Sequence, residues 1–353
     1  MTLYGRAMKY GYSNTRAKAM ESKLIDSTTM RNIADAKDID SVLSILFQTD
    51  YNAAITKFGG LEISPMMFDF AVSENMAGRV NKIAQITPKS DRHIIRTIIA
   101  RWDLGNVKRV LEAIDRKQPY DAISRYIITS TDFTPLVLQD AMRAESVEGA
   151  LGRLMRIGSY RHILEKALAT YKKTRNVLEA MATIDMEHYR ELDALVGELA
   201  KRHDASARLL GMDIEMRNII TLIRAKGRSL PFASIAPSLV VKKENGGSKA
   251  LARLYNSSDS VAAFALKIKS FDLKAAAEAY KENGQLLDFE ISMRNQIFNA
   301  SLKLLRLSSL SFGSLVDYVY LKEIEVFTLR ALIKSKEYGL TKEEVSRLVV
   351  WNL

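Results

Sequence analysis

Hydrophobic side chains recur along the chain with the spacing of an α-helix. The clearest series has intervals of 3, 4, 3 and 4 residues and is formed by Leu209, Met212, Met216, Ile219 and Ile223. Since an α-helix has about 3.6 residues per turn, these five side chains share one face. A stripe that contains methionine can also line a groove for a cofactor or a partner, but such stripes are far more often core. We therefore expect this face to be buried.

The residues that interrupt helices are sparse, because the 353 residues include only 17 glycines and 6 prolines. Segments that look like β-strands are also scarce. The best candidate, 237–241, is short and begins with a proline, which is unfavourable in a strand. The pattern predicts an all-α fold. Turn-forming residues mark the expected loops, which are 58–60, 87–89, 118–120, 227–231 and 244–248.

The helical pattern repeats at long range. Each of three segments begins with a carboxylate, has a small polar residue three positions later, and continues with aliphatic residues; these segments are 103–111, 215–223 and 325–333. The small polar residues are Asn106, Asn218 and Thr328, which are 112 and 110 residues apart. Three such polar pairs could form a ring that contacts a central object. The more ordinary interpretation is that they are satisfied within the fold, as buried polar groups usually are.

Two further landmarks follow nearly the same period. The first is an aromatic residue with an apolar residue five positions before it. It occurs at Tyr51, Tyr160 and Phe271, which are 109 and 111 residues apart. Pro119 and Pro231 each lie 13 residues after the polar landmark, and the same step in the third unit reaches the segment 341–344, which has the pattern of a helix-capping box.

The chain is therefore expected to contain three divergent helical units of about 110 residues, namely 1–118, 119–230 and 231–353 with a closing C-terminal helix. We expect them to surround a pseudo-threefold axis in a closed or funnel-like arrangement. A linear solenoid is the alternative.

Composition narrows the possible functions. A hydrophobic fraction of 47% is typical of a folded protein, and the absence of cysteine excludes disulfides and thiolate metal sites. The sequence contains no stretch of 18 apolar residues, so no membrane-spanning helix is predicted. The formal net charge of +11 suits an acidic protein, an anionic membrane surface or nucleic acid, or it reflects only a well-solvated surface.

The chain offers little that predicts catalysis. No glycine is followed directly by lysine, so there is no phosphate-binding loop of the Walker type, and 244–249 is interpreted as a turn. The four histidines have no metal-ligand spacing; the nearest arrangement is 187–188 with 203–204, and surface or capping roles are preferred for it. We predict no catalytic, cofactor-binding or metal-binding residues.

Four segments together resemble a known family. GYSNTRAKAM at 11–20 is similar to the opening of the C subunit of archaeal-type (A/V-type) rotary ATPases, the family that includes the d subunit of the vacuolar enzyme. NIITLIRAK at 218–226 resembles its second-unit helix. YLKEIEVFTLR at 320–330 and YGLTKEE at 338–344 resemble its C-terminal signature. The resemblance covers essentially the whole chain and depends on the order and spacing of these segments.

The resemblance implies a non-catalytic, funnel-shaped helical subunit that is peripheral to the cytoplasmic face of the cell membrane. Such a subunit sits on the proteolipid ring, receives the central-stalk subunits of D and F type, and transmits torque for proton or sodium transport. It binds no nucleotide. The positive charge could then complement acidic groups of these partners. The cations that we select as candidate contacts, all within the repeated segments or just after them, are Lys108, Arg109, Arg224, Arg330 and Lys334.

Three other functions are compatible with the residues alone. A helical-repeat protein that binds nucleic acid would explain the charge, although basic and aromatic residues are not interleaved as in known binding modules. A general helical scaffold with another partner and an enzyme in an unfamiliar helical fold are the remaining alternatives.

Overall fold

The structure is a computed structural model that describes residues 3–57, 64–128, 132–202, 204–241, 247–307, 310–341 and 344–345. All regular elements in these ranges are helices, which confirms the predicted all-α class. The segment expected to be the best strand candidate instead forms a short 3₁₀ turn, η3 (Ala236–Ser238), followed by extended chain at Leu239. None of the helices in the described ranges is both long enough and apolar enough to cross a membrane.

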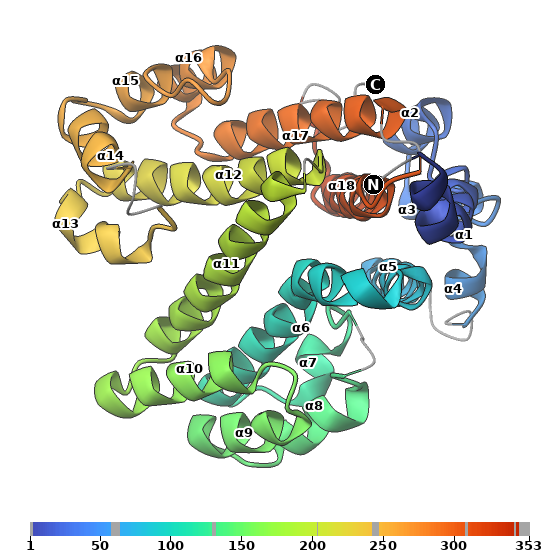
Figure 1. Ribbon diagram of the computed structural model, residues 1–353, viewed down its shortest axis with the longest axis horizontal. Coiled ribbons are helices and arrows are strands. Elements are labelled where there is room, and N and C mark those ends of the chain that lie inside the picture. The colour runs from blue at the N-terminus through green and yellow to red at the C-terminus, as the bar shows by residue number, and fades with distance from the viewer. Residues whose placement is uncertain are drawn as a thin grey trace.

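Six long helices form a closed ring (Figure 1). In chain order they are α5 (Pro65–Ile86), α6 (Arg92–Asp115), α11 (Val177–Lys201), α12 (Ser206–Gly227), α17 (Leu287–Leu307) and α18 (Gly313–Glu337). Each of these helices packs against the next one in the chain, and α18 packs back against α5. The last long helix therefore closes the ring onto the first.

Three lobes of short helices surround the ring (Figure 1). The first lobe consists of α1 (Leu3–Glu21), α2 (Ser27–Asp35), α3 (Ile39–Leu46) and α4 (Asn52–Lys57). The second consists of α7 (Tyr120–Ser124), α8 (Pro135–Met142), α9 (Val147–Leu154) and α10 (Arg161–Thr174), and the third of α13 (Phe232–Ile235), α14 (Gly247–Asn256), α15 (Val261–Leu266) and α16 (Lys274–Asn283). The lobes pack on the ring at α18 and α5, at α6 and α11, and at α12 and α17 respectively.

The ends of the helices follow from side chains that satisfy free backbone groups. Asp38, Ser146 and Ser260 are the N-cap residues of α3, α9 and α15, and each accepts a hydrogen bond from the backbone N–H three residues later. The predicted capping box is confirmed, because Thr341 N donates to Glu344 Oε2 at 2.8 Å and Glu344 N donates to Thr341 Oγ1 at 3.3 Å.

The predicted loops agree with these boundaries where they can be compared. Residues 87–89 lie at the junction of α5 and α6, 118–120 at that of α6 and α7, and 227–231 at that of α12 and α13. The expected loop at 58–60 and most of the one at 244–248 lie outside the described residues, and α14 already begins at Gly247.

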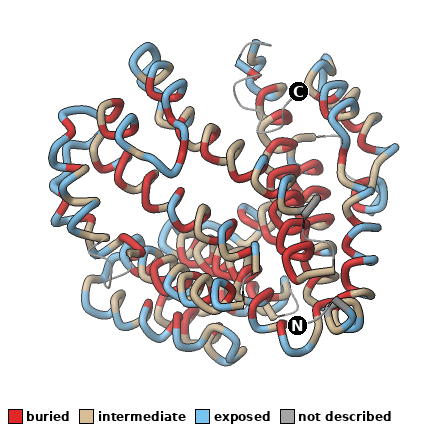
Figure 2. The backbone as a smooth tube through the Cα atoms, turned by 45° about the horizontal axis from the view of Figure 1, so that its top comes forward, coloured by how far each residue is buried: buried red, intermediate tan, exposed pale blue. Residues whose placement is uncertain are grey.

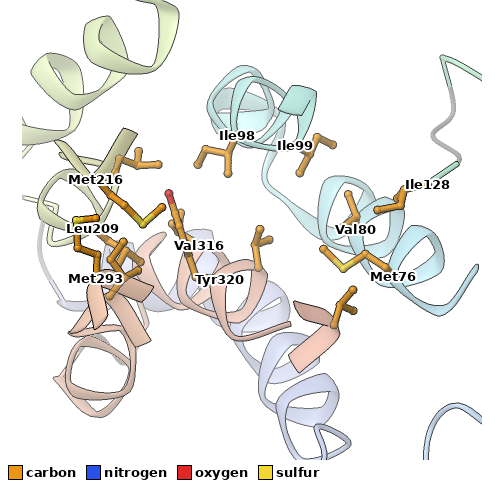
Figure 3. Packing of buried hydrophobic residues seen from close by; sticks show 14 of the residues in the cluster. Met76, Val80, Ile98, Ile99, Ile128, Leu209, Met216, Met293, Val316 and Tyr320 are labelled. Carbon is orange, nitrogen blue, oxygen red and sulfur yellow. The ribbon is translucent and has the colours of Figure 1, made fainter. Parts of the chain in front are cut away.

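The buried side chains concentrate where the long helices meet (Figure 2). The stripe on α12 is core as predicted, since four of its five members are buried and Met212 packs against them. In Figure 3, Ile98 of α6, Met216 of α12 and Tyr320 of α18 belong to one cluster. A second cluster fills the lobe formed by α7–α10. The centre of the ring is therefore packed with side chains from α6, α12 and α18.

Candidate functional site

The repeated asparagines are internal clamps. Asn106 Nδ2 donates to Ile128 O at 2.8 Å, and Ile128 N donates back to Asn106 Oδ1 at 3.3 Å. Asn218 makes the same two bonds to Val240, at 2.8 and 3.0 Å. In both cases the side chain reaches a backbone 22 residues later. The third polar landmark, Thr328, is fully buried, and its hydroxyl has no hydrogen-bond partner within the described ranges.

The repeated carboxylates do not bond to these asparagines but to the aromatic landmarks. Tyr160 Oη donates to Asp103 Oδ2 at 2.7 Å, and Tyr51 Oη donates to Glu325 Oε1 at 2.7 Å. The remaining pair lacks this bond because Phe271 has no hydroxyl and Glu215 is exposed. Glu325 belongs to the last long helix, whereas its tyrosine belongs to the first lobe, so this bond joins the two ends of the repeat series.

The pair formed by Tyr51 and Glu325 belongs to a buried polar cluster. Lys322 Nζ donates to Glu325 and, at 3.0 Å, to Tyr51 Oη, while Ile25 N donates to the same carboxylate at 2.6 Å. Lys322 is 1% exposed and Glu325 is not exposed at all. Burial, and then the charge of Glu325, hold the pKa of Tyr51 well above its ordinary value. Burial lowers the pKa of Lys322, and the charge of Glu325 opposes this effect.

Three residues at equivalent repeat positions meet between α6, α12 and α18. Arg101, Asp213 and Glu323 each precede a polar landmark by five residues. Arg101 Nη2 donates to Asp213 Oδ2 at 2.7 Å, and Nη1 donates to Glu323 Oε2 at 3.1 Å. Tyr320 Oη adds a bond of 2.9 Å to Asp213 Oδ2 (Tyr320 is labelled in Figure 3). Burial opposes ionisation of Arg101, but the two carboxylates outweigh it and hold its pKa well above the ordinary value. We call Arg101, Asp213 and Glu323 the central triad.

His188 lies beside the central triad and is buried. The side chain is 3% exposed, and neither ring nitrogen has a hydrogen-bond partner in the described parts of the chain. Burial, and then the charge of Arg101, lower its pKa from 6.5 to about 3, so the ring is neutral at physiological pH. His203, its suggested companion, lies outside the described residues. Within the described ranges, no group of three or more His, Asp or Glu side chains could hold a metal ion.

Two of the five selected cations, Lys108 and Arg224, form ion pairs with the neighbouring long helices α11 and α17. Lys108 Nζ lies 2.6 Å from Asp185 Oδ1 on α11. Arg224 is exposed, and its Nη2 lies 3.5 Å from Glu290 Oε2 on α17.

The other three selected cations lie close together on α6 and α18. Arg330 Nη2 donates to Ser73 Oγ of α5 at 2.7 Å, and Lys334 Nζ lies 2.6 Å from Glu337 Oε2. Burial, and then the charge of Arg330, lower the pKa of Arg109. A fourth cation, Arg125, which follows the short helix α7, was not predicted as a contact, because the selection was confined to the repeated carboxylate segments and the residues just after them.

Comparison with known proteins places the whole chain in one group. Residues 13–348 match the family described as ATP synthase (C/AC39) subunit. The C subunit of the A-type ATP synthase of Thermoplasma acidophilum is 25% identical over 332 residues, which cover 91% of each chain. The C subunit of the V-type ATP synthase of Deinococcus radiodurans is 24% identical over 348 residues, which cover 96% of this chain and 91% of its relative. Since the match spans nearly all of the helices described above, this chain belongs to the ATP synthase (C/AC39) subunit family.

Proposed function

We propose that this protein is a non-catalytic central-stalk subunit of an A- or V-type rotary ATPase. In this role it couples the rotating stalk, through subunits of D and F type, to the proteolipid ring in the membrane, and so serves proton or sodium transport. It is peripheral, on the cytoplasmic face of the membrane, and binds no nucleotide. The family match over residues 13–348 is the observation that carries this proposal.

The proposed architecture is a funnel of three units, 1–118, 119–230 and 231–353, around a pseudo-threefold axis. The closed ring of long helices supports it, because a linear solenoid would leave α5 and α18 apart. The central triad also supports it, since three positions related by the repeat meet at one point. The two asparagine clamps add that the first two units build the same local contact.

A closed ring suits the transmission of torque. Each long helix is held from both sides, so a twisting load on one lobe is shared by the whole ring rather than bending a single hinge. Buried charge-assisted hydrogen bonds join elements that lie far apart in the chain, and their geometry is directional, unlike that of apolar contacts.

The proposal is tested by purifying a tagged copy of the chain from native membranes and identifying the bound proteins. We expect central-stalk subunits and the proteolipid to be recovered, with yields that fall as salt screens the charge of +11. Recovery of nucleic acid or unrelated soluble proteins, without rotary-ATPase subunits, would contradict it.

A further inference from the structure

Three cations surround a single buried carboxylate between α5, α6 and α18, and a fourth lies beside one of them. The carboxylate is Asp69 of α5, whose side chain is 6% exposed. Arg330 of α18 approaches it most closely, with Nε 3.7 Å from Asp69 Oδ1. The other cations are Lys334, one turn further along α18, Arg109 of α6 and Arg125, which follows α7. We call the four basic residues the cationic cluster.

The hydrogen bonds at this place are incomplete. Asp69 Oδ2, Arg125 Nε and Arg330 Nε are buried atoms that have no hydrogen-bond partner within the described ranges. Arg330 makes one good bond, to Ser73 Oγ, which in turn donates to Arg125 O at 3.0 Å. Buried polar atoms are nearly always paired, and here two unpaired donors stand against one unpaired acceptor, which favours a further acceptor from outside the chain.

The electrostatic balance leads to the same conclusion. Arg109 and Arg330 lie close enough for the charge of one to lower the pKa of the other, beyond the effect of burial. Burial also lowers the pKa of Arg330, which Asp69 only partly offsets. Burial raises the pKa of Asp69 in spite of the cations around it. The cluster therefore lacks negative charge in the protein on its own.

We propose that the cationic cluster is a docking site for carboxylate side chains of an acidic protein segment. The partner carboxylates would accept bonds from the guanidinium groups of Arg109, Arg125 and Arg330, which suit the planar, two-oxygen geometry of a carboxylate. Identifying that segment with a rotary-ATPase subunit depends on the proposed function; the docking chemistry itself does not.

One feature favours a protruding side chain over a flat anionic surface. Acidic residues stand at the rim of the site, since Glu112 is 39% and Glu337 is 35% exposed while Arg330 is only 26% exposed. A lipid surface or a nucleic-acid backbone would have to approach these rim carboxylates, which costs repulsion. A glutamate or aspartate on a helix can instead pass between them.

The direct test uses the full chain and a fluorescein-labelled helical peptide rich in glutamate, with binding followed by anisotropy. The double substitution Arg109→Gln with Arg330→Gln should weaken binding about tenfold or more, because charged hydrogen bonds are lost. Asp69→Asn should act in the opposite direction and tighten binding about threefold, because it removes a repulsive charge. The opposite signs separate a specific site from damage to the fold.

The matched control removes two exposed arginines elsewhere, by Arg31→Gln with Arg143→Gln, which changes the net charge equally. We expect its affinity to stay within about twofold of the original chain, because distant surface charges are screened. Equal weakening in both double variants would overturn the proposal, since net charge alone would then explain binding. Thermal unfolding should show the Arg109 and Arg330 variant to be folded.

Two further outcomes are decisive. If vesicles that contain phosphatidylserine bind through Arg109 and Arg330 while the glutamate peptide does not, the proposal is overturned in favour of a membrane surface. If the original chain recovers rotary-ATPase subunits from membranes and the double variant recovers them equally well, the docking site is wrong while the proposed function stands. If the glutamate peptide binds through Arg109 and Arg330 but the original chain recovers no rotary-ATPase subunits, the docking site stands and the proposed function is wrong.

Discussion

Lys322 and Glu325 lie one turn apart on α18, and both are almost fully excluded from solvent. Taking two charges out of water is costly, and their attraction repays it only when the remaining hydrogen-bonding groups are also satisfied. Tyr51 and the backbone N–H of Ile25 do this for the carboxylate. The stability of the closure between α18 and the first lobe therefore depends on a complete set of polar partners.

We predict that Glu325→Gln lowers the free energy of unfolding by about 3–5 kcal/mol, because it leaves Lys322 buried without a counter-charge. Urea denaturation at neutral pH measures it. Adding Lys322→Met should restore most of the loss, since the uncompensated charge is then gone. The exposed pair of Glu278 and Lys281 has the same spacing, and Glu278→Gln should cost at most about 0.5 kcal/mol. A similar small cost for Glu325→Gln would contradict the role given to this cluster.

Because His188 is buried, we predict that the free energy of unfolding depends on pH. Its pKa is about 3 in the folded chain against 6.5 for an unperturbed histidine, so between these values the unfolded chain binds the extra proton. The contribution of neutral His188 to the free energy of unfolding is therefore fully present above about pH 6.5 and decreases as the pH falls. We expect the free energy of unfolding to drop by about 2 kcal/mol between pH 7.5 and pH 5 for this reason.

The measurement compares the original chain with His188→Leu by urea denaturation at both pH values. The variant should lose less stability on acidification by that amount. His162→Gln, at an exposed position, controls for substitution of a histidine as such and should leave the free energy of unfolding at pH 7.5 within about 0.5 kcal/mol. A parallel loss in the original chain and in His188→Leu would show that another group is responsible.

Nothing in the sequence marks Lys322 or His188 as buried. Lysine and histidine within an amphipathic helix are ordinarily placed at its solvent face, and α18 has buried residues on all sides because both neighbouring long helices and the first lobe cover it. Burial of this kind is decided by tertiary packing, which the periodicity of one helix does not encode.

The segments that follow α7 and η3 are held in the same way, each by one amide side chain, from α6 and from α12 respectively. Ile128 and Val240 lie outside regular helices, and Asn106 and Asn218 pair both the backbone N–H and the backbone C=O of these residues. The period of the landmarks was visible in the sequence, and so was the apolar stripe on α12. The partners were not, because Ile128 and Val240 contribute backbone groups, which any residue carries.

We expect Asn106→Ala and Asn218→Ala each to lower the free energy of unfolding by about 2–4 kcal/mol, since two buried backbone groups lose their partners. Amide hydrogen exchange should rise locally at Ile128 or Val240. Asn299, which is exposed on α17, provides the control, and Asn299→Ala should not destabilise the chain. Exchange that is unchanged at Ile128 in Asn106→Ala would refute the clamp.

On the scale of the whole molecule, the centre of the ring is joined by one positive and two negative side chains from α6, α12 and α18. If the proposed threefold relation holds, these three positions are interchangeable to a first approximation. The sequence repeat led to the expectation of three units, but which equivalent residues touch could not be read from it, because Arg101, Asp213 and Glu323 share no residue type.

This equivalence is tested by moving the positive charge around the axis. Arg101→Glu alone gathers three carboxylates and should destabilise the chain by about 4 kcal/mol or more. Adding Glu323→Arg restores one cation between two acids and should recover at least half of the loss. Thermal and urea unfolding measure both variants. Arg101→Glu with Glu278→Arg has the same net charge and should give no recovery, because Glu278 is exposed and paired with Lys281; recovery in this control would contradict the equivalence.

The closure of the ring also sets the order in which the protein can be completed during synthesis. Tyr51 and Glu325 are 274 residues apart, and Asn14 and the backbone of Ser311 are 297 apart. At about 5–20 residues per second, the first lobe waits on the order of 15–60 s on the ribosome before its main partner, α18, exists. During that time its apolar face is uncovered. The earliest part of the chain is thus the last to be secured, and a nascent chain stalled before α18 is the species most exposed to aggregation and to capture by chaperones.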